Sequence, residues 1–451
     1  EFMKRLLALV VAVLMLAALQ LGFAEEAFKT EFAVEATGKT FHIYSWNDEF
    51  QGMLAKYYIP AVGGSVAEDG SLLLPNGDKI EFVINPNDNG VYQQKLDAAL
   101  AAGEQIDMFL MEADYILKYV DSEYTVALES VGITEDMMKE QYPYTIDAAK
   151  DSKGVIKGSS WQAAPGLFLY RRSLAEKYLN VKTPEEMQEK VKDWDSFIDT
   201  ARKVNEASKG ETKLIASNGD AWQVIRTART QPWVNESLKL VIDDQVKWYF
   251  DFAKTLFTEN LTANAAPWSE AWNAGIGNDS VLGYFFPTWG IQWVMTGNSG
   301  GKKPGEGTYG DWGAVNGPQP YYWGGTWLAV GQKCENLPLA KSIIEYFTLN
   351  AASMKDYCLK SKDYVNNKAA VQAIIDDGFS FDFLGGQDHY KLFQEVTSLI
   401  DTSAMSAYDQ NINIALDTEV NAYIRGEKDL DTALADFKTA VADLFPEISV
   451  D

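Results

Sequence analysis

The stretch KIEFVINPNDNGVYQQKLDAALAAGEQIDMFLMEAD, residues 79–114, decides the fold class of this 451-residue chain. Its first six residues alternate polar and apolar side chains with a period of two, as in a half-buried strand. Residues 91–102 place Leu96 and Leu100 on one face of a helix, and residues 106–111 form an apolar run that ends at an acid. Strand, helix and strand in this order predict a parallel α/β sheet, which holds ligands beyond the carboxyl ends of its strands.

The same alternation extends in both directions along the chain. A strand is predicted at 40–45 and a helix at 48–58, before the stretch quoted above. The pattern restarts after it, with predicted strands at 166–170, 213–216 and 281–286, predicted helices at 193–207 and 238–256, and a helical tail over 390–444. Because 451 residues exceed one ordinary core, we expect two or more domains.

Composition excludes several classes of function. The 64 acidic and 39 basic residues give a net charge of −25, which repels nucleic-acid phosphates, so we expect no nucleic-acid partner. The chain has two histidines, His42 and His389, and no GxxxxGK[ST], HExxH or CxxC motif. We therefore expect no metal, no cofactor and no catalytic residues, although the many carboxylates leave a glycosidase open by residue type.

The amino terminus predicts export. Glu1 and Phe2 precede the first methionine and resemble a cloning scar, and residues 3–24 have the basic start, apolar run and small residues of a signal peptide. We expect cleavage after Ala24, with a retained anchor as the alternative. No cysteine follows the apolar run, so we expect a soluble periplasmic or cell-surface protein without a lipid anchor.

The stretch YYWGGTW, residues 321–327, gathers four aromatic rings around Gly324 and Gly325. Glycine allows a sharp bend or a close approach of the backbone, and aromatic faces suit either a core or a flat ligand. Two interpretations follow: a packed strand pair with a tight turn, or a binding platform.

Five segments together resemble one family. They are YSWNDEF (44–50), LDAALAAGEQIDMFLMEAD (96–114), WQAAPGLFLYRRSL (161–174), VLGYFFPTWGIQW (281–293) and GDWGAVNGPQPYYWGGTWLAV (310–330). Their order resembles that of bacterial extracellular solute-binding proteins of the carbohydrate ABC-transporter class, which are similar in layout to maltose-binding protein. The chain departs from the family where Asn-Lys-Asp is usual after Tyr170, since Arg171, Arg172 and Ser173 stand there.

The resemblance implies an α/β, two-lobed periplasmic-binding-protein fold, each lobe a sheet flanked by helices, with a hinge and a ligand cleft between the lobes. By analogy, the N-terminal lobe comprises residues 38–162 plus 316–349, and the C-terminal lobe comprises 163–315 plus 350–445. It implies a monomeric receptor without enzymatic activity that passes an oligosaccharide to the permease subunits of an ABC transporter.

The resemblance and the predicted strand ends together indicate the ligand contacts. They are Trp46, Asp48, Glu49, Glu112, Asp114, Trp161, Asn218, Asp220, Trp222, Trp289, Trp323, Gly324, Gly325 and Asn413. Helix capping is the alternative role of the acids at 48, 112 and 114, and burial is the alternative for Trp222. Trp268 and Trp272 are four residues apart, so one is expected in the core and the other at the cleft.

Two other functions remain open. YSWNDEF also resembles the start of polyamine-binding proteins, and carboxylates beside aromatic rings suit ammonium groups. A secreted glycosidase would need an acid and a nucleophile or base at a defined separation, and the resemblance provides no such pair.

Overall fold

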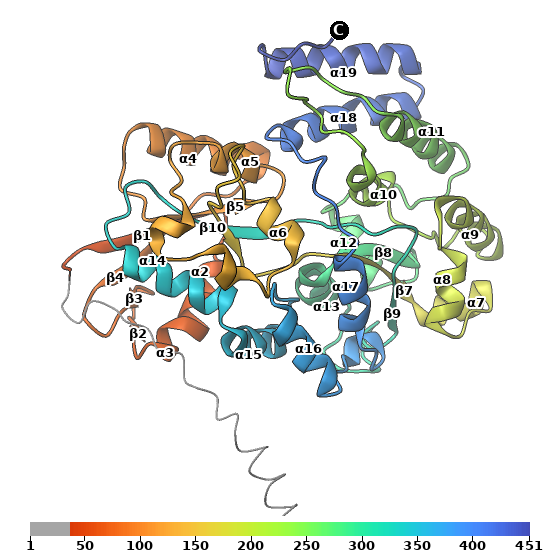
Figure 1. The fold of residues 1–451 in the computed structure, drawn as a ribbon. Coiled ribbons are helices and arrows are strands. Elements are labelled where there is room, and N and C mark those ends of the chain that lie inside the picture. The colour runs from red at the N-terminus through yellow and green to blue at the C-terminus, as the bar shows by residue number, and fades with distance from the viewer. Residues whose placement is uncertain (1–36) are drawn as a thin grey trace, which may run out of the picture.

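The computed structural model describes residues 37–451 and forms two lobes, each built around its own sheet (Figure 1). The predicted signal peptide, residues 3–24, lies outside the described residues. The sheet of the first lobe has seven strands in the order β2-β3-β4-β1-β5-β10-β6. These strands are β1 (Thr40–Ser45), β2 (Ser65–Val66), β3 (Leu72–Leu73), β4 (Lys79–Ile84), β5 (Met108–Glu112), β6 (Ser159–Ser160) and β10 (Thr326–Val330).

The predicted parallel unit is confirmed at the centre of this sheet. β1 pairs in parallel with β4 and with β5, whereas β10 enters antiparallel between β5 and β6. Alternate residues of β5 enter opposite cores, because successive side chains of a strand point to opposite faces. Met108 and Leu110 join the core beneath α2, while Phe109 and Met111 join the core beneath α4.

Helices cover both faces of the first sheet (Figure 1). They are α2 (Glu49–Met53), α3 (Ile59–Ala61), α4 (Val91–Ala101), α5 (Ile116–Val120), α6 (Pro143–Asp147) and α14 (Leu337–Ile344), with π-helical turns at Leu54–Tyr58 and Glu345–Leu349. Leu96 and Leu100 of α4 are buried, as the apolar spacing predicts. Short 3₁₀ turns lie at Asp88–Gly90, Leu128–Val131 and Glu135–Met138.

The second lobe contains a three-stranded sheet, in the order β8 (Gly283–Pro287), β7 (Gly166–Arg171) and β9 (Trp312–Val315). Both pairs are antiparallel, so the expectation that the parallel alternation restarts here is wrong. Residues 213–216 form no ladder strand and make only single parallel bridges, Lys213 to Val281 and Ile215 to Thr262. The spacing of apolar residues predicts that a segment is an extended strand. Which strand it pairs with, and in which direction, depends on contacts distant in sequence.

The remaining α-helices belong to the second lobe and the carboxyl-terminal part. They are α7 (Arg172–Leu179), α8 (Pro184–Lys190), α9 (Trp194–Ala207), α10 (Asn218–Ile225), α11 (Asp244–Thr258), α12 (Glu270–Ile276), α13 (Thr296–Asn298), α15 (Ala351–Ser361), α16 (Lys368–Asp376), α17 (His389–Thr397), α18 (Asp409–Ile424) and α19 (Leu430–Leu444). A π-helical turn lies at Gly290–Met295, and 3₁₀ turns lie at Arg226–Ala228 and Asp382–Leu384.

The helix predicted from residue 238 begins later, at Asp244. The carboxylate of Asp243 accepts the amide of Val246 at 3.0 Å and caps the helix, while Leu238 has a left-handed φ of 53° that no α-helix permits. The cap residue, rather than the apolar spacing, therefore sets the start of α11.

Three chain segments lie side by side where the lobes join. The amide of Trp323 donates to the carbonyl of Ala164 at 3.0 Å, and the amide of Ala163 donates to the carbonyl of Tyr364 at 3.1 Å. The chain thus leaves the first sheet after β6, returns before β10, and passes the same junction again near residue 364. The segment after β6, the segment before β10 and the segment near residue 364 therefore meet at one interface between the lobes.

Within residues 37–451, no helix is long and apolar enough to cross a membrane. Cys334 and Cys358 are both free thiols, and the helix α14 lies between them along the chain.

Candidate functional site

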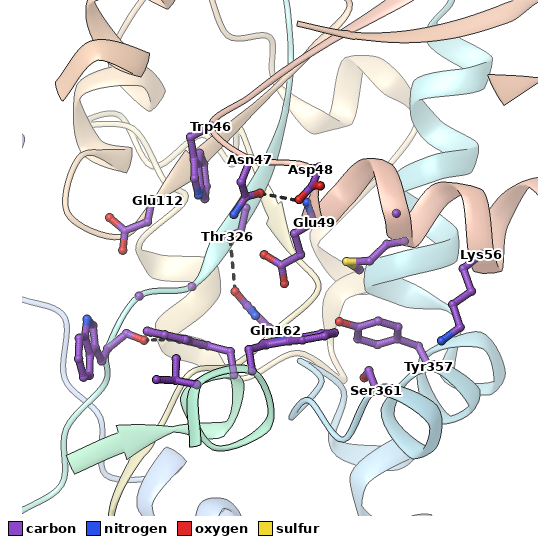
Figure 2. Close-up of a pocket in the computed structure, with 18 of the residues that line it drawn as sticks. Trp46, Asn47, Asp48, Glu49, Lys56, Glu112, Gln162, Thr326, Tyr357 and Ser361 are labelled. Atoms are coloured by element: carbon purple, nitrogen blue, oxygen red, sulfur yellow. Dashed lines mark hydrogen bonds between the residues drawn. The ribbon is translucent and has the colours of Figure 1, made fainter. Parts of the chain in front are cut away.

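A cavity of about 760 Å³ opens between the two lobes, beside the junction (Figure 2). Its walls come from the loop after β1, the start of α2, the end of β5, the start of β10, the segment after β8 and the end of α15. The lining residues are Trp46, Asn47, Asp48, Glu49, Gly52, Met53, Lys56, Tyr57, Glu112, Gln162, Trp268, Trp289, Trp293, Val294, Trp323, Gly324, Gly325, Thr326, Tyr357 and Ser361.

The loop after β1 presents a polar group to the cavity. The hydroxyl of Ser45 donates to the carbonyl of Asn47 at 2.7 Å, and the amide oxygen of Asn47 accepts the backbone amide of Glu49 at 3.2 Å. These two bonds turn the chain at the end of the strand, so that Asn47 and Glu49 project toward the cavity (Figure 2). Asp48 occupies the position before α2 but makes no capping hydrogen bond, and its side chain is exposed.

Two carboxyl groups in the cavity wall hold their protons unusually strongly. Burial, and then the negative charges of Asp363 and Asp48, raises the pKa of Glu49 to about 8. Burial also raises the pKa of Glu112, with the charge of Asp114 adding to the effect and that of Arg226 opposing it. A carboxyl group that stays protonated near neutral pH can donate a hydrogen bond as well as accept one.

Tryptophan rings form the opposite wall. The planes of Trp268 and Trp289 are nearly parallel, 9° apart with centroids 6.1 Å apart, and the ring of Trp323 meets Trp289 edge-on at 5.3 Å. Trp268 is 55% exposed and Trp293 is 54% exposed, which is unusual for a side chain of this size. These exposed ring faces give the cavity a broad apolar surface.

Trp268 also has a strained backbone. Its φ is +70°, a region that non-glycine residues rarely occupy. Such strain persists only where surrounding structure imposes it, and it is often found at ligand-binding sites.

The glycine pair in YYWGGTW brings backbone to the cavity surface. Gly324 and Gly325 have φ values of +73° and +114°, and a Cβ at Gly324 would lie 3.4 Å from the indole nitrogen of Trp289 and 3.6 Å from a carboxyl oxygen of Glu112. The bare backbone therefore leaves room in the cavity where any side chain would intrude.

The aromatic rings of YYWGGTW divide between the core and the cavity wall. Tyr321 and Trp327 are buried, and their polar atoms donate to the backbone carbonyls of Leu167 and Thr145 at 2.8 Å. Trp323, between them, lines the cavity. The stretch is a packed strand pair at its ends and a cavity wall in its middle.

The junction supplies a buried polar network beneath the cavity. The side chain of Gln162 accepts the hydroxyl of Thr326 at 3.3 Å and donates to Asp363 at 2.9 Å (Figure 2 shows the first bond). Asp363, which is fully buried, also accepts the hydroxyl of Thr288 at 2.9 Å. Burial raises the pKa of Asp363, and its hydrogen bonds oppose that shift.

The structure brings eight of the residues predicted from the sequence together around this cavity. They are Trp46, Asp48, Glu49, Glu112, Trp289, Trp323, Gly324 and Gly325. Trp268 joins them while Trp272 is fully buried, so the pair divides as the sequence suggested, one ring at the cavity and one in the core.

Two predicted residues lie near the cavity without lining it. Asp114 forms an ion pair with Arg226, with 2.9 Å between carboxylate oxygen and guanidinium nitrogen. Trp161 is 1% exposed and stacks on Phe50, with ring centroids 5.0 Å apart. Trp161 thus supports the loop behind the cavity wall.

The remaining four predicted residues lie away from the cavity. The first two belong to the amino-terminal turn of α10, where Asn218 donates to the hydroxyl of Tyr249 and Asp220 accepts the indole of Trp272. Trp222 is 5% exposed and packs on Tyr249, which matches its alternative role as a buried residue. Asn413, on α18, accepts a hydrogen bond from the indole nitrogen of Trp233.

Several lining residues were not predicted from the sequence. Trp293 follows Trp289 by four residues, a spacing that places two residues on one helix face and could have indicated it. Tyr357 and Ser361 lie on α15, more than 300 residues along the chain from Trp46, and no local pattern connects them. Within residues 37–451, no three His, Cys, Asp or Glu side chains are grouped to hold a metal ion.

Comparisons with known proteins agree with this architecture. A family model described as bacterial extracellular solute-binding protein matches residues 76–379. No curated protein sequence matches the chain. The crystal structure of an extracellular solute-binding protein of family 1 is 18% identical, with a TM-score of 0.73, and the match covers 90% of this chain and 99% of that one.

Two bifidobacterial structures are also similar. The ABC-transporter-associated binding protein of B. animalis subsp. lactis, solved with β-1,6-galactobiose, is 18% identical with a TM-score of 0.68, covering 92% of this chain and 99% of that one. The galacto-N-biose-/lacto-N-biose I-binding protein of Bifidobacterium longum, solved with lacto-N-biose, is 13% identical with a TM-score of 0.70, covering 93% and 100%. At these identities the likeness shows the fold alone.

Proposed function

The chain belongs to the bacterial extracellular solute-binding proteins, and we propose that it binds an oligosaccharide in the cavity between its lobes. The tryptophan wall carries this proposal, because Trp268, Trp289 and Trp293 present broad ring faces with no fixed charge. The C–H face of a sugar ring is apolar and flat, so it suits an aromatic surface.

The polar wall opposite supports the same ligand class. Sugar hydroxyls need partners that both donate and accept, and protonated carboxyl groups at Glu49 and Glu112 do both. Asn47 and the bare backbone at Gly324 add further groups at the same surface. The disaccharides bound by the two bifidobacterial structures support a sugar ligand by analogy of fold.

We place the lobe boundaries where the sequence predicted them, with residues 38–162 plus 316–349 moving against 163–315 plus 350–445. The passage of the chain between sheets after β6 and before β10 supports this division. We further propose that the protein is an exported monomer, that it delivers its sugar to the permease subunits of an ABC transporter, and that it does not cleave the sugar.

A cationic ligand is the second candidate, and the charge of the cavity favours it. Asp48, Glu49 and Glu112 line the cavity, against a single lining base, Lys56. A polyamine would draw the carboxyl groups into their ionised form, and its ammonium groups would lie against the tryptophan faces.

The sign of the pH dependence separates the two candidates. A neutral sugar should bind at least as well at pH 6 as at pH 8, because protonated Glu49 remains a donor below its pKa of about 8. A polyamine should bind more tightly as the pH rises toward 8, since binding favours the ionised carboxylate. Calorimetric titration of the purified protein with neutral di- and trisaccharides and with spermidine at both pH values measures this difference.

The variant Glu49→Gln sharpens the test, because glutamine keeps a donor and an acceptor but cannot ionise. We expect it to retain sugar affinity within about threefold, which is less than 1 kcal/mol. Tight spermidine binding that Glu49→Gln abolishes would overturn the sugar proposal. Chromatography that detects cleaved glycosidic bonds after incubation would instead support the glycosidase alternative.

A further inference from the structure

One ion pair joins the lobes outside the ligand cavity. Asp114 follows β5 in the first lobe, and Arg226 directly follows α10 in the second lobe. Their charged atoms are 2.9 Å apart, and the side chains are 27% and 8% exposed. A pair this sheltered is screened less than a surface pair, so it contributes to whichever state holds the two groups together.

Two further contacts join the same edges of the lobes. The side-chain amide of Gln93 on α4 donates to the side-chain oxygen of Gln410 on α18. Met405, in the segment before α18, is 7% exposed and is buried in the core that α4, α5 and β5 form in the first lobe.

The segment that carries Met405 is anchored on the second lobe. The guanidinium of Arg229 donates to the carbonyl of Ala404 at 3.2 Å and lies 3.5 Å from the carboxylate of Asp409. The hydroxyl of Ser406 donates to the same carboxylate at 2.7 Å. Residues 404–410 therefore extend from the second lobe and insert one apolar side chain into the first.

From these contacts we propose that Asp114–Arg226, Gln93–Gln410 and Met405 form a lobe latch that holds the closed form of the protein even without ligand. The proposal assigns Asp114 to lobe closure rather than to ligand contact. It goes beyond the proposed function and does not depend on the ligand being a sugar.

The lobe latch also adjoins the ligand cavity. The backbone amide of Asp114 donates to a carboxyl oxygen of Glu112 at 2.8 Å, and Glu112 lines the cavity. Asp114 therefore belongs both to the latch, through its side chain, and to the turn that holds Glu112, through its backbone amide. Since apparent affinity scales with the fraction of protein in the binding-competent form, a weakened latch should weaken binding.

The closed form is held by a balance that single substitutions can shift. Among the described residues, the buried Nε of Arg226 and Nη1 of Arg229 have no hydrogen-bond partner. Because Arg226 pairs across the lobes, closing them leaves part of the hydration of its guanidinium group uncompensated, which opposes closure. The ion pair and the buried Met405 must offset that cost.

Small-angle X-ray scattering of the ligand-free protein tests the latch. We expect the wild type to scatter as the closed shape, and Arg226→Gln and Asp114→Asn each to increase the radius of gyration. The double variant should show no larger increase than either single variant, because both remove the same interaction. Arg202→Gln is the matched control, since it breaks the pair of Arg202 with Glu259 inside the second lobe and should leave the radius unchanged.

Two outcomes would overturn the proposal: an unchanged radius in folded Arg226→Gln and Asp114→Asn, or shifts that add in the double variant. If Arg226→Gln does not fold, Asp114→Asn and Gln410→Ala carry the test, and circular dichroism establishes folding for each. Binding of lacto-N-biose to the same variants gives a second measurement. If the fraction of molecules in the closed form falls to about one tenth, the Kd should rise about tenfold. Absence of any sugar binding would count against the proposed function and leave the scattering result intact.

Discussion

The indole nitrogen of Trp289 donates a hydrogen bond to the backbone carbonyl of Trp323, 3.0 Å away. Trp289 follows β8 of the second lobe, whereas Trp323 belongs to the segment that returns to the first lobe. The bond thus fixes an aromatic ring of one lobe against the backbone that leads into the other. It couples the proposed sugar platform to the junction about which the lobes are connected.

Trp268→Ala should weaken sugar binding by about 2–4 kcal/mol, or about 30- to 1,000-fold in Kd, with little change in melting temperature. The exposed ring contributes a contact face but little core, at 55% exposure. Trp272→Ala is the matched control, because that ring is fully buried and its loss should cost about 3–5 kcal/mol of stability. Equal melting shifts in the two variants would contradict the assignment.

Trp323→Ala should reduce stability and affinity together. Its ring lines the cavity with one side and lies parallel to Phe286 on the other, 2° between planes and 5.9 Å between centroids. Trp289→Ala, which removes a half-buried ring, should weaken binding at a smaller cost in stability. Calorimetry and thermal melting without ligand, measured on both variants, distinguish the two patterns; normal binding by both would exclude a tryptophan platform.

Stability should fall as the pH rises from about 4.5 to about 8. Burial raises the pKa of Glu49 to about 8 in the folded protein from an unfolded value near 4.5, so the folded state binds more protons in this range. Since stability rises with pH only where the unfolded state binds more protons, here it must decrease. The free energy of unfolding should fall by on the order of 2 kcal/mol over this pH range, because Glu49 is partly exposed and solvent screens its charge.

Glu49→Gln should make this pH profile less steep, because glutamine does not titrate, whereas Glu112 still contributes its own raised pKa. Urea unfolding of both proteins at pH 5, 6, 7 and 8 measures the difference in slope. A profile of the variant that is parallel to that of the wild type would show that Glu49 ionises normally.

Asp363→Ala should destabilise the protein by on the order of 3 kcal/mol or more. The substitution leaves the buried donors of Gln162 and Thr288 without their acceptor, and each unsatisfied group costs about 1–3 kcal/mol. Asp356→Ala is the control, because Asp356 is 46% exposed in a surface ion pair with Lys360 and should cost less than about 1 kcal/mol. Similar urea midpoints for the two variants would contradict the role given to Asp363.

Local sequence patterns were sufficient for the central elements β1, β4 and α4 of the first lobe. β1 and β4 begin and end where the alternation of apolar residues predicts, and α4 buries the two leucines that its period places inward. Such signals are local, because the period of a strand or helix depends on only a few neighbouring residues. The residues at the carboxyl ends of β1 and β5 were found for the same reason, since parallel strands end at one edge of a sheet.

Tertiary structure alone decided which polar residues share the cavity. Asp114 and Glu112 are two residues apart and both carry a carboxyl group, yet only Glu112 lines the cavity, because Asp114 lies within reach of Arg226 from the other lobe. Trp222 and Trp289 each follow a predicted strand, and packing against Tyr249 buries the first while the second forms a wall. The sequence thus determined the fold class and the family, through short-range periodicity and the order of motifs. The selection of cavity residues needed the arrangement of the two lobes in space, because it depends on contacts between segments as distant in sequence as Trp46 and Tyr357.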